Sequence, residues 1–66
     1  MIRNGDTIDY RKAGNRTTLR MIVDQVNYAD GYACCEGRLI NRATNTPEAG
    51  GVWMVLLSDA DYVARV

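Results

Sequence analysis

The side chains that could do chemistry in this sequence are two adjacent cysteines, several carboxylates and tyrosines, and one lysine. The chain has no histidine. Without histidine, neither a Ser-His-Asp nor a Cys-His arrangement can form within one chain, and the commonest general acid/base is missing. Two cysteines fall short of the four nitrogen or sulfur ligands of a structural zinc site. The sequence therefore predicts a protein that is not an enzyme and that holds no metal and no cofactor.

The two cysteines, Cys34 and Cys35, are neighbours in sequence. Neighbours in a strand point to opposite faces, so the two thiols are not expected to meet in a disulfide. We expect one of them in the core and the other exposed or at an interface, and free thiols are typical of a reducing compartment. The carboxylate of Glu36 would raise the pKa of Cys35, so no reactive thiol is predicted.

Charge is neutral overall but unevenly distributed, with +3 over residues 1–20 and −3 over residues 21–66. The basic side chains that could form a binding patch are Arg11, Lys12, Arg16 and Arg20. Together with Tyr10 they are candidates for contacts with RNA or DNA phosphates and bases. The neutral total argues against this, because domains that bind nucleic acid are typically strongly basic.

Sixty-six residues predict a single domain, 1–66, with one small core whose stability needs support from a partner subunit or from an efficiently packed barrel. Short segments rich in β-branched and aromatic residues, separated by Gly, Asn and Asp, predict an all-β fold of five short antiparallel strands. The expected strands are 7–11, 17–27, 32–40, 52–57 and 62–66.

Within the long second strand, the apolar residues change parity near Asp24-Gln25, which predicts a β-bulge. An alternative is a helix over 18–26, whose apolar residues also fall at i, i+3, i+4 and i+7. Asp30-Gly31 directly afterwards favours a tight hairpin and therefore the strand. Gly37 in the third strand predicts a bulge or a close approach of two backbones.

The segment 41–51 is rich in Asn, Thr and Gly, holds the only proline, and is expected to be a mobile loop that is functional or disordered. After the apolar run 52–57, Ser58 and Asp61 form a pair typical of a capping box, which predicts one turn of 3₁₀ helix before the last strand.

This order of elements resembles the SH3-like small barrels over nearly the whole chain. The residues that carry the resemblance are Gly5-Asp6-Thr7-Ile8 at the front and Leu57-Ser58-Asp59-Ala60-Asp61-Tyr62-Val63 at the back. The fold hosts many unrelated functions. Its eukaryotic signalling members bind proline-rich ligands, but their acidic, aromatic first-loop motif is not present here, so proline recognition is not carried over.

The apolar run 52–57 predicts a surface for a protein partner or for a second copy of the chain. If Val52, Met54 and Leu56 face inward, Trp53, Val55 and Leu57 form an apolar outer row, which a monomer does not normally leave exposed. Coverage of this strand by the loop or by the termini is the alternative. The residues predicted to bind a partner are Trp53, Val55, Leu57 and Tyr32.

The leading hypothesis is thus a non-enzymatic binding module, an adaptor or an inhibitor, of the small kind frequent in phages and plasmids. A homo-oligomeric enzyme is an alternative, because plasmid-encoded dihydrofolate reductases of the small-barrel type have similar length. Their Val-Gln-Ile-Tyr run has its nearest counterpart in Val52-Trp53-Met54-Val55, which lacks both the Gln and the Tyr. The N-terminal residues have no apolar h-region, and no apolar run reaches the length of a membrane span, so a cytoplasmic location without membrane contact is expected.

Overall fold

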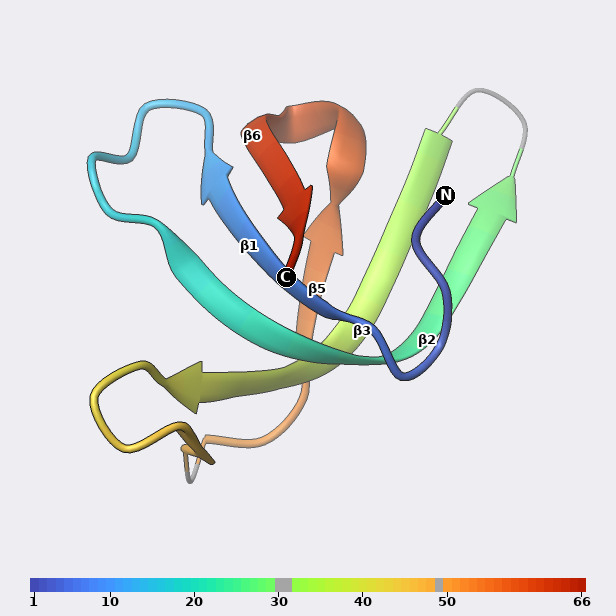
Figure 1. Cartoon of the computed structure of the whole chain (residues 1–66). Coiled ribbons are helices and arrows are strands. Elements are labelled where there is room, and N and C mark those ends of the chain that lie inside the picture. The colour runs from blue at the N-terminus through green and yellow to red at the C-terminus, as the bar shows by residue number, and fades with distance from the viewer. Residues whose placement is uncertain (30–31, 49) are drawn as a thin grey trace.

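The computed structural model describes residues 1–29, 32–48 and 50–66 and is an all-β structure built on one antiparallel sheet (Figure 1). Its elements are β1 (Thr7–Lys12), β2 (Leu19–Ala29), β3 (Tyr32–Asn41), β4 (Thr46–Pro47), β5 (Trp53–Leu56), the 3₁₀ helix η1 (Leu57–Asp59) and β6 (Ala60–Arg65). The all-β class is confirmed, and the number of strands is six where five were predicted. The additional strand is β4, which pairs with the end of β3 inside the segment expected to be a loop.

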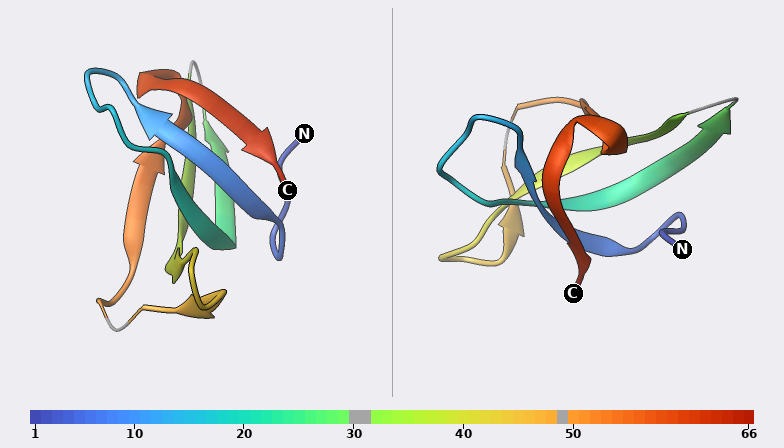
Figure 2. Two further views of the ribbon diagram at one scale, coloured as in Figure 1. Left: turned by 60° about the vertical axis from the view of Figure 1, so that its left-hand side comes forward. Right: turned by 90° about the horizontal axis from the view of Figure 1, so that it is seen from above.

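The strands follow the order β4-β3-β2-β1-β6, and β5 pairs with β3 beside this path. One end of the sheet is formed by β6, whose partner is β1, and the other end by β4 and β5, which both pair with β3. Of these, β5 and β6 are neighbours along the chain. They follow each other in sequence through η1, so the sheet must curl for its two ends to come this near, as two further views show (Figure 2).

The curl comes from β2, which belongs to two parts of the sheet. Its first residues, from Leu19 to Ile22, pair with β1, and residues from Met21 to Ala29 pair with β3. The register shifts between Val23 and Gln25. The bulge predicted at Asp24-Gln25 is thus confirmed, and the alternative of a helix over 18–26 is wrong.

Gly37 marks the close approach of two backbones that the sequence predicted. A Cβ atom at this position would collide with the backbone carbonyl oxygen of Ile22 and with the terminal methyl of Met21. Gly37 lies opposite Val23 of β2 on one side and opposite Trp53 of β5 on the other. It therefore lies in the part of β3 that pairs with both β2 and β5, next to the bulge of β2.

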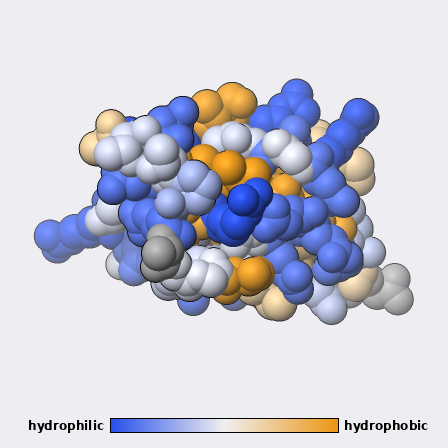
Figure 3. Space-filling model, turned by 90° about the horizontal axis from the view of Figure 1, so that it is seen from below, coloured by the Kyte–Doolittle hydropathy of each residue, from blue (hydrophilic) through white to orange (hydrophobic). Residues whose placement is uncertain are grey.

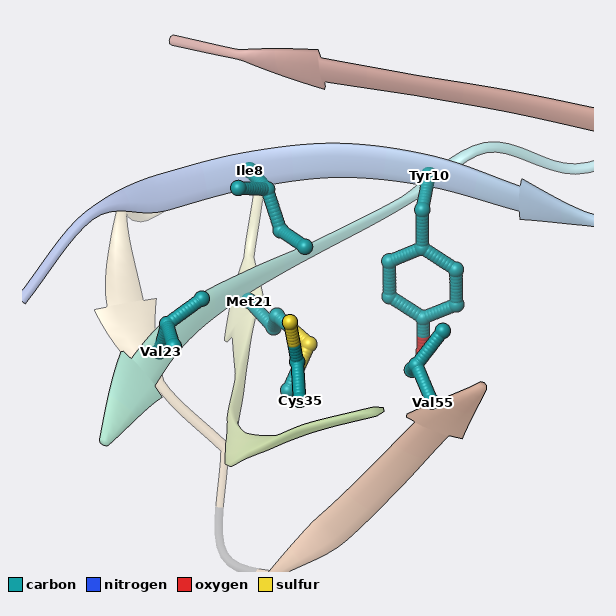
Figure 4. Close-up of a cluster of buried hydrophobic side chains, with 6 residues drawn as sticks. All are labelled: Ile8, Tyr10, Met21, Val23, Cys35 and Val55. Atoms are coloured by element: carbon teal, nitrogen blue, oxygen red, sulfur yellow. The ribbon is translucent and has the colours of Figure 1, made fainter. Parts of the chain in front are cut away.

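The core is a cluster of side chains from four strands (Figure 4): Ile8, Tyr10, Met21, Val23, Cys35 and Val55. Cys34 is also buried, with 8% of its surface exposed, so neither cysteine is exposed, and the alternative expectation of an interface position for one of them stays a prediction. Both thiols are free. As neighbours in a strand they point to opposite faces of β3, and both are buried.

The turn of 3₁₀ helix before the last strand is confirmed, but the expected cap is wrong. Leu56 occupies the N-cap position with an extended backbone, and no side chain makes a capping hydrogen bond. Ser58 lies inside η1 and Asp61 lies in β6. The backbone N–H of Ala13 donates to the carbonyl of Asp59 at 2.9 Å, which ties the turn to the end of β1.

The predicted hairpin turn at Asp30-Gly31 lies outside the described residues. The ladder of β2 and β3 leading to this turn has no register shift from Gln25↔Glu36 to its last pair, Ala29 with Tyr32. In the segment 41–51, the Asn41 side chain accepts hydrogen bonds from the N–H groups of Ala43 and Thr44, and the N–H of Asn45 donates to the Asn41 carbonyl. Mobility of this segment stays a prediction.

Candidate partner-binding groove

The free edge of β5 is the start of the candidate site. Among the described residues β5 pairs with β3 alone, through Cys34↔Leu56, Cys35↔Val55, Glu36↔Met54 and Gly37↔Trp53. In an antiparallel pair, alternate residues direct their N–H and C=O away from the partner. Two of the four residues of β5 therefore direct their backbone N–H and C=O away from β3, toward the edge where no other described strand pairs.

The side chains of β5 divide between two faces, because consecutive residues of a strand point to opposite sides. Val55 points into the core, where Tyr10 extends from β1 toward it (Figure 4). Trp53 shares the face of Val55 but lies at the rim, with 46% of its surface exposed. Met54, on the other face, is 65% exposed.

A hollow of about 790 Å³ follows this edge. The residues of β5 and η1 that line it are Trp53, Met54, Val55, Leu56 and Asp59. A hollow that touches four consecutive residues of one strand must lie beside the strand's edge, since either face alone would offer only alternate residues. We call this space the β5 groove.

The opposite wall of the β5 groove comes from β1 and the residues that follow it. Tyr10, Lys12, Asn15 and Leu19 line that wall, while Tyr32, Cys34 and Glu36 of β3 line the floor on the Met54 side. The volume is within the range of about 300–1,000 Å³ typical of ligand-binding clefts. The groove thus offers apolar walls and unpaired backbone groups in one place, which suits an extended chain.

The structure corrects the predicted outer row of Trp53, Val55 and Leu57. Val55 is only 8% exposed and belongs to the core, and Leu57 is half-buried against that core. Val52 and Met54, which were expected to face inward, are 70% and 65% exposed. The apolar run holds large side chains at every position, so its alternation carried no signal about which parity faces the core.

Tyr32 and Trp53, the other predicted partner-binding residues, are both half-exposed and both line the β5 groove. Met54 was not predicted as a site residue, and Tyr10 was a candidate only for contacts with nucleic acid. Met54 was missed because its parity was assigned inward, and Tyr10 because only the fold brings β1 opposite β5. Whether any of these residues binds a partner stays a prediction.

The basic residues proposed for nucleic acid are not equally available. Arg20 donates from Nε to Oδ1 of Asp9 at 2.7 Å and from Nη2 to Oδ2 at 3.0 Å. Lys12 lines the β5 groove and Arg16 is exposed in the β1–β2 loop. Arg11 is half-buried, and its Nε has no hydrogen-bond partner among the described residues.

The Asp9–Arg20 pair is the least exposed ion pair of the described residues, with 15% and 22% of the two side chains exposed. The hydrogen bonds from Arg20, together with its positive charge, lower the pKa of Asp9 from its ordinary value of 3.8 against the opposing effect of burial. Asp24 and Arg38 form a second bidentate pair, at 3.0 and 3.2 Å, but these side chains are 43% and 47% exposed. The first pair joins β1 to β2 and the second joins β2 to β3.

Burial also shifts the pKa values of two further side chains. Burial raises the pKa of the Cys35 thiol, and the neighbouring Cys34 raises it further. The predicted direction is therefore confirmed, but burial, rather than the adjacent Glu36, is its main cause. Burial also raises the pKa of Tyr10. At neutral pH both side chains stay protonated and neutral, so neither is an activated nucleophile.

In residues 1–29, 32–48 and 50–66, no three side chains of His, Cys, Asp or Glu type come together as a metal site would require. The same part of the chain includes no helix with the length and hydrophobicity that crossing a bilayer demands. Seen from below, apolar side chains reach the surface amid a mostly hydrophilic face (Figure 3).

Comparison of the chain with protein-family profiles, with curated proteins and with solved structures finds no significant match. The function must therefore be argued from the fold and from the β5 groove.

Proposed function

We propose that this chain is an SH3-like small barrel that works as a non-enzymatic protein-binding module. The turn of 3₁₀ helix between β5 and β6, and the bent β2 shared by two parts of the sheet, support the barrel. The observation that carries the binding role is the β5 groove, in which an uncovered strand edge lies beside the half-exposed Trp53. Exposed apolar surface at an unpaired edge favours contact with another polypeptide.

The mode of binding that suits this geometry is addition of an extended strand. The unpaired N–H and C=O groups of β5 would bind the main chain of the added strand, and the apolar walls would bind its side chains. Trp53 is the aromatic anchor of this surface, and anchors of this type contribute most to binding at interfaces. The role is that of an adaptor or an inhibitor, exerted in a reducing compartment such as the cytoplasm, where the free Cys34 and Cys35 remain reduced.

The test uses three immobilised proteins: the wild type, Met54→Lys in the groove, and Tyr62→Lys on β6 as the matched control. Both substituted side chains are about half or more exposed, so both variants are expected to fold. Each is exposed to a lysate of the source cells treated with nuclease. The proposal expects a protein captured by the wild type and by Tyr62→Lys but not by Met54→Lys.

The captured protein is then purified and added to the wild type while tryptophan fluorescence is recorded. Trp53 is the only tryptophan of the chain, so transfer of its ring out of water should shift its emission to shorter wavelength. Equal capture by all three proteins, or no change in the emission of Trp53, would overturn the groove as the binding site. Recovery of nucleic acid that nuclease treatment abolishes would instead favour the exposed basic residues Lys12 and Arg16.

A further inference from the structure

We infer that the occupant of the β5 groove is a second copy of this chain, whose β5 pairs antiparallel with the first about a two-fold axis at Met54. This inference rests on the proposed function, because it names the partner of the same surface. It starts from the free edge, which offers unpaired backbone groups, and from the hollow beside it, which leaves room for an added strand.

Symmetry restricts how two identical strands can pair. In an antiparallel pair, residues opposite each other lie on the same face of the sheet, and successive residues alternate between faces. A two-fold axis perpendicular to the sheet must therefore pass beside a residue that faces its own copy, because an axis between two residues would pair opposite faces. Met54 fits this position, since it is 65% exposed whereas the adjacent Val55 is buried.

A residue that faces its own copy must not be charged, because identical charges directly opposite each other repel. The residues on either side of it pair with one another across the axis, so like charges at those positions would repel as well. The run from Val52 to Leu57 contains no charged residue and no proline. With the axis at Met54, Trp53 lies opposite Val55 of the other copy and Val52 lies opposite Leu56, so every pair is apolar.

The charges around the groove are compatible with this pairing. Its lining includes one cation, Lys12, and two carboxylates, Glu36 and Asp59. Each groove is lined by positive and negative charges, so two copies can meet there without the repulsion that charges of one sign alone would cause.

Because the core is small, pairing with a second copy would stabilise the folded chain. A chain of 66 residues buries only about 60% of the surface that it exposes when unfolded, and chains of this size often gain stability by association. Here Val52, Trp53 and Met54 remain 70%, 46% and 65% exposed. Pairing at β5 would cover part of the exposed surface of these side chains and extend the sheet across two copies.

The register is tested with Met54→Cys, with Tyr62→Cys on β6 as the control for random collision. Directly opposite residues in an antiparallel pair have Cα atoms about 4.5–5.5 Å apart, which falls within the range of disulfides. Under mild oxidation at micromolar concentration, we expect Met54→Cys to become a covalent dimer at least about tenfold faster than Tyr62→Cys, with no loss of β-sheet signal in circular dichroism. Equal rates for the two variants would overturn the register.

Association itself is measured by sedimentation equilibrium of the wild type, Met54→Lys and Tyr62→Lys. The inference expects a mass of twice 7.4 kDa for the wild type and for Tyr62→Lys. Two lysines facing each other should weaken the dimer of Met54→Lys by roughly a hundredfold or more, since like charges in contact oppose association strongly. A wild type that stays monomeric up to millimolar concentration would overturn the inference.

These outcomes separate the inference from the proposed function. If the wild type is monomeric but a captured protein shifts the emission of Trp53, the second copy is wrong and the binding module stands. If the wild type is monomeric and no protein is captured, both are wrong. If the wild type dimerises through Met54 and captures nothing else, the second copy is the partner.

Discussion

The strands β5 and β6 lie at opposite ends of the sheet and are adjacent in sequence. They differ in whether charged residues protect their outer edges. β6 has Asp61 and Arg65 among its six residues, and the Arg65 side chain reaches Asp6 at 3.7 Å. β5 has no charged residue at all. Charged side chains on an outer strand discourage pairing with a further strand, and an uncharged, apolar edge invites it. One edge of this small sheet is thus protected, and the other is available.

The two strands also differ in how they are tied to the rest of the molecule. Backbone hydrogen bonds flank β6 at both ends: Ala13 donates to Asp59 before it, and Val66 donates to Thr7 after it. β5 is held by its pairing with β3 and by the burial of Val55. The available edge therefore depends on few contacts, and substitutions that remove those contacts should affect it most.

The largest effect is expected for Gly37→Ala, which acts on the β5 end of the sheet. The added Cβ would meet the Ile22 carbonyl, and backbone atoms cannot move aside as a flexible side chain can. We expect a loss of about 3 kcal/mol or more in the free energy of unfolding, at the upper end of the range for overpacked sites. Urea unfolding followed by circular dichroism measures this loss.

Gly50→Ala is the matched control, because the nearest atom to a Cβ there would be Trp53 Nε1 at an ordinary contact distance of 3.7 Å. It should change the free energy of unfolding by about 0.5 kcal/mol or less. A Gly37→Ala variant as stable as Gly50→Ala would show that the two backbones are farther apart than they are in this structure.

An intermediate effect is expected for Val55→Ala compared with Val63→Ala. Both change valine to alanine on an outer strand, but Val55 is buried in the core and Val63 is only half-buried against it. We expect losses of about 2 kcal/mol for Val55→Ala and about 1 kcal/mol for Val63→Ala, because the lost burial of two methyl groups and the cavity are larger in the core. Urea midpoints of the two variants measure the difference, and a reversed order would mean that β6 is the better anchored strand.

The smallest effect concerns the β1 side of the sheet, on which β6 lies. The pKa of Asp9 is lowered in the folded protein, so the pair with Arg20 stabilises the fold fully above pH 3.8 and loses that contribution as the pH falls further. We expect Asp9→Asn to be less stable than the wild type at pH 7, and the difference to shrink below pH 3.8. Thermal unfolding at pH 7, 4 and 3 measures it.

Asp24→Asn is the control on the β3 side, where the partner pair is more exposed. Its loss at pH 7 should stay below about 1 kcal/mol, as is usual for exposed ion pairs. If Asp24→Asn proves more destabilising than Asp9→Asn, the ion pair between β1 and β2 is not the stronger of the two.

Much of the fold follows from local patterns in the sequence. The alternation of Ile8 and Tyr10 with polar residues predicted β1, because a strand with one buried face needs that period. The parity change at Asp24-Gln25 predicted the bulge, and Gly37 predicted the close approach. The pair of Ser58 and Asp61 after the apolar run predicted the turn η1, although neither side chain caps it. These features depend on a few neighbouring residues, and for that reason the sequence alone was enough to predict them.

The candidate site was predictable only in part. The apolar run 52–57 indicated a surface for association, and Trp53 and Tyr32 do lie at the β5 groove. The sequence by itself determined that residues 53–56 carry no charge and that the chain has no histidine, and it predicted that the two thiols are free. Tertiary structure alone decided that Val55 rather than Met54 faces the core, that Cys34 is covered as well as Cys35, and that Arg20 is engaged by Asp9. The reason is physical: a run of large apolar residues has no preferred inner face of its own, so the strands packed against it determine which side is buried.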